Sequence, residues 1–554
     1  MASVAVDRLI PTPPPSDDEK SPIVSPCHVL DVPSKLSSTS RLQYERKMGD
    51  TELSYFLPSR QSGVNDMYLH LGFQAREDLV KRSRVAIVWA ILRLRHPLLA
   101  SSVEMHDYDD VRFVYTAPAN SDNALSDADS YLEYREQSKD VLIDSYLNGP
   151  RTLSNTRLSY LIVSTPRSDS IPTPPLSPTE AGASDVPEDG GERQHDILIC
   201  AMHFLGDGMA LHQFANDFFS LLGSEKTELE LRQQLDDEWA TRWDTPADAI
   251  LPKALEENIP VKWTRMRQAA AHVDFLMSQE RFVGGQAFPR RKHPERHTVV
   301  PTISFPEDRT KAILKKCKAN GVSISAALFA VCNVAWARMG DGRKELPSMM
   351  YSALNLRPYF TVKPSAPWNS YWFLAIGYFN VVLPNFLPSD DKVESTFWHR
   401  ARQAKEQSTQ AAKNPLVVSR THEMARERGE RARRWGKEDD EREKGTWVPP
   451  SPPSASSPTE RVLPVRAEAP SSALMGLSLL GNLDGIYKHA NFPYIRMHTL
   501  TTGSRQRNGA MLLFGYTFAG KLWISLGYDE NGFADDVVDK FWAAAIDCVD
   551  QFLG

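Results

Sequence analysis

A histidine and an aspartate stand four residues apart in the segment His203-Phe204-Leu205-Gly206-Asp207-Gly208. An imidazole has an unperturbed pKa near neutrality, so it suits the work of a general base. An apolar run of strand type, residues 197–202, ends directly at His203. The pattern allows a proton-accepting histidine held by a rigid element. The alternative is a core histidine that only caps the strand.

The residues around this histidine allow a sharp junction between a strand and a helix. Gly206 and Gly208 predict a tight backbone bend, and Gly208 also allows the close approach of a substrate. Asp207 is either a functional carboxylate or an ordinary turn residue before glycine. His212 lies on the following helix, and its side chain could either pack in the core or contact a substrate.

The elements that position His203 follow from hydrophobic periodicity. A strand over 196–203 and a helix over 209–222 flank the segment. The first half also predicts a helix over 76–95 and strands over 112–115 and 158–163. The second half predicts helices over 307–319, 324–339, 393–412 and 534–552, and strands over 349–354, 378–383, 474–483, 510–518 and 522–528. Both halves mix helices and strands, so we expect an α/β fold.

The chain divides into two units on composition. Residues 1–40 are rich in proline and serine and predict a disordered tail. We expect an N-terminal subdomain over 41–245 with a loop insertion at 165–194, and a crossover over 246–300 with a helix around 261–280. A C-terminal subdomain spans 301–554. Its segment 426–470 is first charged and then proline-rich, which predicts a flexible insertion.

Composition excludes several classes of protein. The net charge of −6 over 554 residues gives no reason to expect nucleic acid as a partner. The sequence contains no run of eighteen apolar residues, so no membrane span is predicted. The five cysteines are scattered and the fourteen histidines lack HExxH or HxH spacing, so we expect neither a disulfide framework nor a metal. No serine-nucleophile elbow or nucleotide-binding glycine loop occurs, and no cofactor is expected to stay bound. The sequence shows no signal pattern, so we expect a cytoplasmic protein. We also expect it to be a monomer.

The segment at 203–208 matches the HxxxDG pattern and resembles the CoA-dependent acyltransferase superfamily, which includes chloramphenicol acetyltransferases, condensation domains and plant BAHD enzymes. Similar segments are His96-Pro97-Leu98-Leu99, Asn355-Leu356-Arg357-Pro358 and, with altered order, residues 477–484. Residues 206–212 look like fungal trichothecene O-acetyltransferases, and mannosylerythritol lipid acyltransferases are similar too. The plant DFGWG box is missing; the nearest string is Phe514-Gly515-Tyr516.

The resemblance implies two chloramphenicol-acetyltransferase-like subdomains packed face to face, with a channel between them and His203 near its middle. Acyl-CoA as co-substrate would enter from one side and a small-molecule alcohol from the other. His203 would take the hydroxyl proton and pass it to the CoA thiolate. Asp207 would turn away from the imidazole and pair with an arginine, for which Arg357 is the candidate. Asn355 is a supporting residue in the same segment.

The oxyanion donor is open on sequence alone. Ser478 or Asn482 could supply a hydroxyl or an amide, or the two could be an ordinary polar pair in a loop. The expected activity is O-acyl transfer, with acetyl as the expected acyl group, to a hydroxyl of a fungal secondary metabolite such as a glycolipid or terpenoid. Two alternatives remain. One is a condensation-like enzyme that uses a carrier-protein thioester and an amine, and the other is a catalytically inactive binding scaffold.

Overall fold

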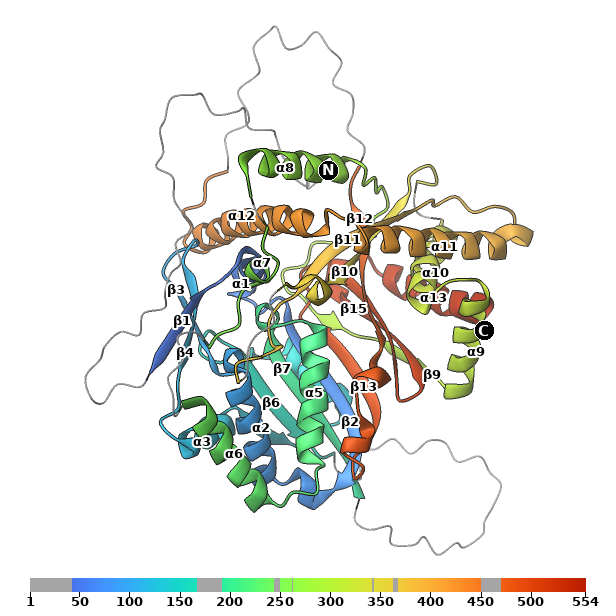
Figure 1. Ribbon diagram of the computed structural model, residues 1–554. Helices are drawn as coiled ribbons and strands as arrows, with labels where there is room; N and C mark the ends of the chain where they lie inside the picture. Colours follow the sequence, from blue (N-terminus) through green and yellow to red (C-terminus); the bar gives the residue numbers. More distant parts are fainter. Residues whose placement is uncertain are drawn as a thin grey trace, which may run out of the picture.

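A computed structural model describes residues 42–166, 192–243, 250–261, 263–340, 343–361, 367–449 and 470–554. The predicted tail at 1–40, nearly all of the loop at 165–194 and most of 447–470 lie outside the described residues. Two large sheets, each with its own helices, form two subdomains side by side (Figure 1). This arrangement is the predicted α/β fold of two subdomains.

The N-terminal sheet has five strands in the order β13-β2-β7-β6-β5. These strands are β13 (Arg496–Ser504), β2 (Asp66–Arg76), β7 (Glu192–Met202), β6 (Ser159–Ser164) and β5 (Leu132–Arg135). Its helices are α1 (Asp50–Ser59), α2 (Arg82–Arg95), α3 (Ser121–Ser130), α4 (Lys139–Asn148), α5 (Gly208–Leu222) and α6 (Glu228–Trp243). A small sheet of β1 (Gln43–Lys47), β4 (Val111–Thr116) and β3 (Ser102–Met105) lies beside them.

The C-terminal sheet has seven strands, with the path β11-β10-β12-β14-β15-β8 and β9 paired to β15. They are β8 (Thr298–Val299), β9 (Thr302–Phe305), β10 (Ser348–Asn355), β11 (Ile376–Leu383), β12 (Ala473–Asn482), β14 (Met511–Phe518) and β15 (Lys521–Asp529). The remaining helices are α7 (Leu255–Asn258), α8 (Arg265–Glu280), α9 (Glu307–Ala319), α10 (Ile324–Met339), α11 (Val393–Ala412), α12 (Val417–Glu443) and α13 (Val537–Leu553).

Each sheet buries apolar side chains against its helices. Strand β7 is buried along its apolar run in the first hydrophobic core, which also contains Phe214 of α5. Within the sheet it pairs antiparallel with β2, with Ile197 opposite Leu71. Helix α10 is almost entirely buried in the second core. It starts where the Ser323 hydroxyl accepts from the Ala326 amide and stops at Gly340, whose φ of 76° suits glycine. Burial in these cores is why α5 and α10 carry the apolar residues from which the sequence predicts them.

The two subdomains exchange strands, so the predicted boundaries do not hold everywhere. Strand β13 follows the C-terminal strand β12 in the chain, yet it pairs antiparallel with β2 of the N-terminal sheet, with Leu500 opposite Leu71. Strand β8 lies in the predicted crossover but pairs with β15. Hydrogen bonding to the other subdomain's sheet decides where each segment belongs, and composition carries no signal for that choice.

The expected flexible insertion is wrong for its charged part. Residues up to Glu443 belong to the 27-residue helix α12, which packs against α1 and α8 across the seam of the two subdomains (Figure 1). Several of its charges are paired with distant residues: Arg433 binds Asp50 at 2.8 Å, and Asp440 accepts two hydrogen bonds of 2.9 Å from Arg60. The segment folds because distant residues neutralise it.

Within the described residues, no single helix is long and apolar enough to cross a bilayer. The bent pair α9 and α10 passes that test together, with an angle of 90° between them. Cys200, Cys317, Cys332 and Cys548 are buried free thiols.

Candidate active site

His203 lies at the point where strand β7 ends and a short 3₁₀ turn, His203–Leu205, leads into α5. Its Nδ1 is 3.1 Å from the carbonyl oxygen of Gly206. A carbonyl oxygen only accepts, so Nδ1 carries the proton and the Nε2 lone pair is free. The side chain is half-buried. This orientation is the one a general base requires.

The surroundings of His203 favour its neutral form. Burial lowers the pKa of the His203 imidazole, and the positive charge of Arg428 lowers it further. The ring stacks on Tyr55 of α1, with the ring centroids 4.4 Å apart. The Tyr55 hydroxyl in turn hydrogen-bonds the hydroxyl of Tyr378 on β11, in the other subdomain. His203 therefore lies where the two subdomains meet.

Asp207 supports the loop that carries His203. Its carboxylate is 2% exposed and accepts from Nη1 of Arg357 at 3.0 and 2.9 Å, so the predicted pairing with Arg357 is confirmed. One oxygen also accepts from the amide of Ala375, and the other caps α5 by accepting from the amide of Ala210. Arg357 further donates to the carbonyl of Phe373 at 3.1 Å. The carboxylate thus ties the loop to the C-terminal subdomain.

The glycines of this loop serve close packing, and the bend at the junction is made by the 3₁₀ turn His203–Leu205 before them. Gly206 is extended, with φ −177° and ψ −179°, and Gly208 opens helix α5. A Cβ on Gly208 would lie 3.1 Å from a methyl of Leu480, and a Cβ on Gly206 would lie 3.3 Å from the Cβ of Ala210. Each position therefore has little room for a side chain.

The other residues predicted for the site contact different parts of the structure. Asn355 is exposed and accepts from the amide of Arg357 at 3.1 Å, so it shapes the turn that presents the arginine. Ser478 is half-buried on β12, and Leu480 of the same strand reaches Gly208. Asn482 is exposed and its side-chain oxygen accepts from the Thr517 hydroxyl at 3.2 Å. Among the described contacts, none joins Ser478 or Asn482 to His203.

His212 is a packing residue in this structure. It is 1% exposed, and its Nδ1 lies 2.9 Å from the hydroxyl of Tyr487. Burial lowers the pKa of His212 to about 3. The ring is therefore neutral and enclosed, which favours the packing interpretation over contact with substrate.

Sequence reasoning missed three residues beside His203. Tyr55, Tyr378 and Arg428 come from α1, β11 and α12, and the guanidinium carbon of Arg428 is 4.4 Å from the ring centroid of Tyr378 and 5.4 Å from that of Tyr55. These residues are far apart in the chain and form no motif. The one signal in the sequence was the recurrence of small residues along 425–436, which is typical of a packed helix face. These residues are buried in α12.

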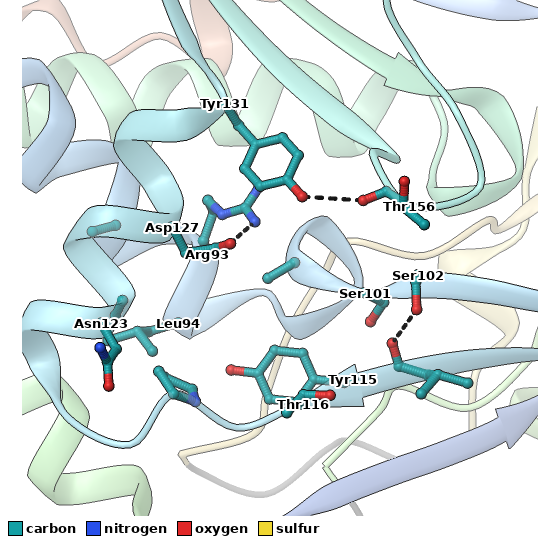
Figure 2. A pocket seen from close by; sticks show the side chains of 15 residues that line it. Arg93, Leu94, Ser101, Ser102, Tyr115, Thr116, Asn123, Asp127, Tyr131 and Thr156 are labelled. Atoms are coloured by element: carbon teal, nitrogen blue, oxygen red, sulfur yellow. Dashed lines mark hydrogen bonds and ion pairs between the residues drawn. The ribbon is translucent and has the colours of Figure 1, made fainter. Parts of the chain in front are cut away.

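Two cavities lie elsewhere in the described structure. One of about 230 Å³ lies between α2, α3 and β4, where Arg93 pairs with Asp127 at 2.7 Å (Figure 2). The other, of about 100 Å³, lies between α8, α12 and β11, and Tyr378 forms part of its wall. Neither has His203 among its lining residues, so the channel at His203 stays a prediction. Among the described residues, no group of His, Cys, Asp or Glu could hold a metal ion.

Comparison with known proteins gives a fold. No family model and no curated protein matches the sequence. The structure is similar to that of TRI3 trichothecene 15-O-acetyltransferase from Fusarium sporotrichioides, with a TM-score of 0.65 and 12% identity over 94% of this chain and 96% of that one.

Domains of peptide and polyketide synthases are similar too. The epimerization domain from the third module of tyrocidine synthetase B has a TM-score of 0.53 and 13% identity, over 93% of this chain and 99% of that one. The condensation domain of the monacolin K polyketide synthase MokA has a TM-score of 0.51 and 9% identity, over 93% and 98%. The chain therefore has the two-subdomain fold of the chloramphenicol acetyltransferase type.

Proposed function

We propose that this protein is an acyl-CoA-dependent O-acyltransferase that uses His203 as its general base. The observation that carries the proposal is the hydrogen bond from His203 Nδ1 to the Gly206 carbonyl, which leaves Nε2 free at the seam between the subdomains. A pKa held low by burial keeps that nitrogen unprotonated at neutral pH. The similarity to an O-acetyltransferase across nearly the whole chain agrees with this role.

The reaction is a direct transfer. Nε2 of His203 takes the proton of the acceptor hydroxyl as its oxygen attacks the thioester carbonyl carbon. The tetrahedral species collapses when the carbon–sulfur bond breaks, and the imidazolium returns its proton to the CoA thiolate. Asp207 and Arg357 take no part in proton transfer. They hold the loop so that Nε2 stays in place, and no covalent acyl-enzyme is needed.

The proposed substrates are acetyl-CoA or another short-to-medium acyl-CoA and a hydroxyl of a fungal secondary metabolite, a glycolipid or a terpenoid. The test measures release of free CoA thiol from acetyl-CoA in the presence of terpenoid and glycolipid alcohols, for the wild type and for His203→Ala. An alcohol-dependent rate in the wild type and its loss in the variant support the proposal.

The second candidate is a condensation-like enzyme, and the similarity to condensation and epimerization domains favours it. Its substrates would be a carrier-bound thioester and an amine. The same assay separates the two, because a condensation-like enzyme would use an amine with an acyl-pantetheinyl carrier protein and would leave acetyl-CoA intact. A binding scaffold would use neither pair.

A further inference from the structure

An arginine–tyrosine cluster stands next to His203. It consists of Tyr55, Tyr351, Tyr378, Arg428 and Arg507. Arg428 lies over the rings of Tyr55 and Tyr378, and the rings of Tyr351 and Tyr378 have centroids 6.3 Å apart. The guanidinium carbon of Arg507 lies 6.0 Å from the ring centroid of Trp435, which shares helix α12 with Arg428. Burial raises the pKa of Tyr351, and the charges of Arg428 and Arg507 oppose that rise. The Tyr55 ring, which stacks on His203, connects the cluster to the candidate base.

Both subdomains build the cluster. Tyr55 comes from α1 in the N-terminal half, Tyr351 and Tyr378 come from the C-terminal sheet, and Arg428 comes from α12, which crosses between them. Tyr351 is 36% exposed, and Arg507 is exposed as well. The cluster therefore has a side open to solvent and a side against His203.

The two arginines of the cluster differ from several arginines of helix α12 that pair with a carboxylate. Arg420, Arg426, Arg431 and Arg433 on the same helix pair with Asp274, Glu423, Glu427 and Asp50. Among the described residues, no carboxylate forms an ion pair with Arg428 or Arg507. Partial burial lowers the pKa of the Arg507 guanidinium, and the nearby charges of Arg428 and Arg431 lower it further, whereas Tyr351 and the Asp439 carboxylate raise it.

Two guanidinium groups gathered without a carboxylate repel each other. Burial opposes the charge of Arg428, which the Tyr55 and Tyr378 hydroxyls support. A bound anion would remove both penalties, and a guanidinium presents its donors in a fork that fits a carboxylate or phosphate. Tyrosine hydroxyls beside them add further hydrogen-bonding groups. We propose that Arg428 and Arg507 bind a carboxylate or phosphate group that a substrate carries close to its reacting atoms.

The position of the cluster restricts the source of that anion. In an acyl-CoA the phosphates lie at the far end of the pantetheine arm, well away from the thioester carbonyl that would stand at His203. An anion held one tyrosine ring away from His203 therefore belongs to the acceptor or to the distal end of a dicarboxylic acyl group. This assignment to a substrate rests on the proposed function, whereas anion binding itself does not.

The test uses the full chain and two small probes, malonate and its neutral isostere malonamide. Diethyl pyrocarbonate modifies His203, and peptide mass spectrometry follows the rate at that residue. We expect malonate to slow the modification of wild type in a saturable way, and malonamide to leave the rate unchanged. Arg428→Gln should weaken malonate protection by about tenfold or more, the loss expected for one charge-assisted contact.

Arg507→Gln is the second variant, because Arg507 is exposed and we expect its replacement to leave the fold intact. It too should weaken malonate protection. Arg426→Gln is the matched control, because Arg426 lies on helix α12 with Arg428 but pairs with Glu423. Malonate should protect His203 in this variant as well as it does in the wild type. Equal protection by malonate and malonamide, or unchanged protection in both Arg428→Gln and Arg507→Gln, would overturn the proposal.

The values of kcat/KM for different substrates then show which substrate carries the anion. If Arg428→Gln lowers kcat/KM for malonyl-CoA by a larger factor than for acetyl-CoA with the same alcohol, the anion belongs to the acyl group. If it lowers kcat/KM by a larger factor for acceptors that carry a carboxylate or phosphate than for neutral acceptors, the anion belongs to the acceptor. Failure of His203→Ala to abolish turnover would contradict the proposed function while leaving the protection result unaffected, so the two failures are distinguishable.

Discussion

Nη1 of Arg357 lies 3.0 and 2.9 Å from the two carboxylate oxygens of Asp207, and no hydrogen bond joins that carboxylate to His203. The aspartate of the His-x-x-x-Asp pattern is thus bound into a buried ion pair between the subdomains. Its role is to position the loop, and the imidazole takes its orientation from the Gly206 carbonyl instead.

Removing Arg357 should destabilise the protein strongly. Arg357→Ala leaves the Asp207 carboxylate buried without its partner, which costs about 3–5 kcal/mol. The double variant Asp207→Asn/Arg357→Ala should lose less than the two single variants summed. Thermal unfolding measures the effect, with Arg76→Ala at the exposed pair Arg76–Asp78 as a control that should not shift the melting temperature. Simple additivity would contradict the coupling.

Acyl transfer should fail on the acidic side of neutrality. The pKa of His203 is lowered from 6.5 by burial, and only the neutral ring can accept a proton. The value of kcat/KM should therefore be level at neutral pH and fall as pH drops through a pKa below 6.5. A pH–rate profile checks this, and an acid limb with a pKa above 7 would contradict the burial of His203.

Stability should also decline in acid, partly through His212. Its folded pKa of about 3 lies below the unfolded value of 6.5, so the unfolded chain binds the proton more readily between these pH values. His212 therefore costs no stability above pH 6.5 and destabilises the fold progressively as pH falls toward 3. His212→Gln should flatten the fall of melting temperature over this range. An unchanged slope would show that the ring is not held neutral.

Helix α12 should depend on glycine where it meets α1. A Cβ on Gly429 would lie 2.5 Å from a carboxylate oxygen of Asp50 and 2.9 Å from its Cβ. In an exposed helix, glycine to alanine gains about 1 kcal/mol, but here the clash should reverse the sign. Gly429→Ala should lower the melting temperature, and Gly436→Ala should do so less, because its nearest neighbour is the flexible end of Arg60. Stabilisation by Gly429→Ala would show that α12 does not pack on α1.

Local sequence was enough to predict the loop that carries His203. An apolar run followed by His203, Asp207 and the periodic helix after it specify a strand, a junction and a helix, and the structure has all three. The pairing of Asp207 with Arg357 followed from a family resemblance, since 150 residues separate the two.

The rest of the site depended on contacts that a local pattern cannot encode. Strand β13 lies in the N-terminal sheet because β2, more than 400 residues earlier, offers it a free edge. Residues 426–443 look solvated in isolation, but Asp50, Arg60 and Asp274 neutralise the helix that contains them. That helix brings Arg428 to His203, so missing its fold also meant missing the arginine–tyrosine cluster.

The most direct test of the central claim is the steady-state rate of CoA thiol release from acetyl-CoA with an accepted alcohol, compared between wild type and His203→Ala at equal folded concentration. Loss of a general base predicts a fall in kcat of about 10²–10⁴-fold with an unchanged melting curve. A variant that turns over at nearly the wild-type rate would contradict the assignment of His203 as the base.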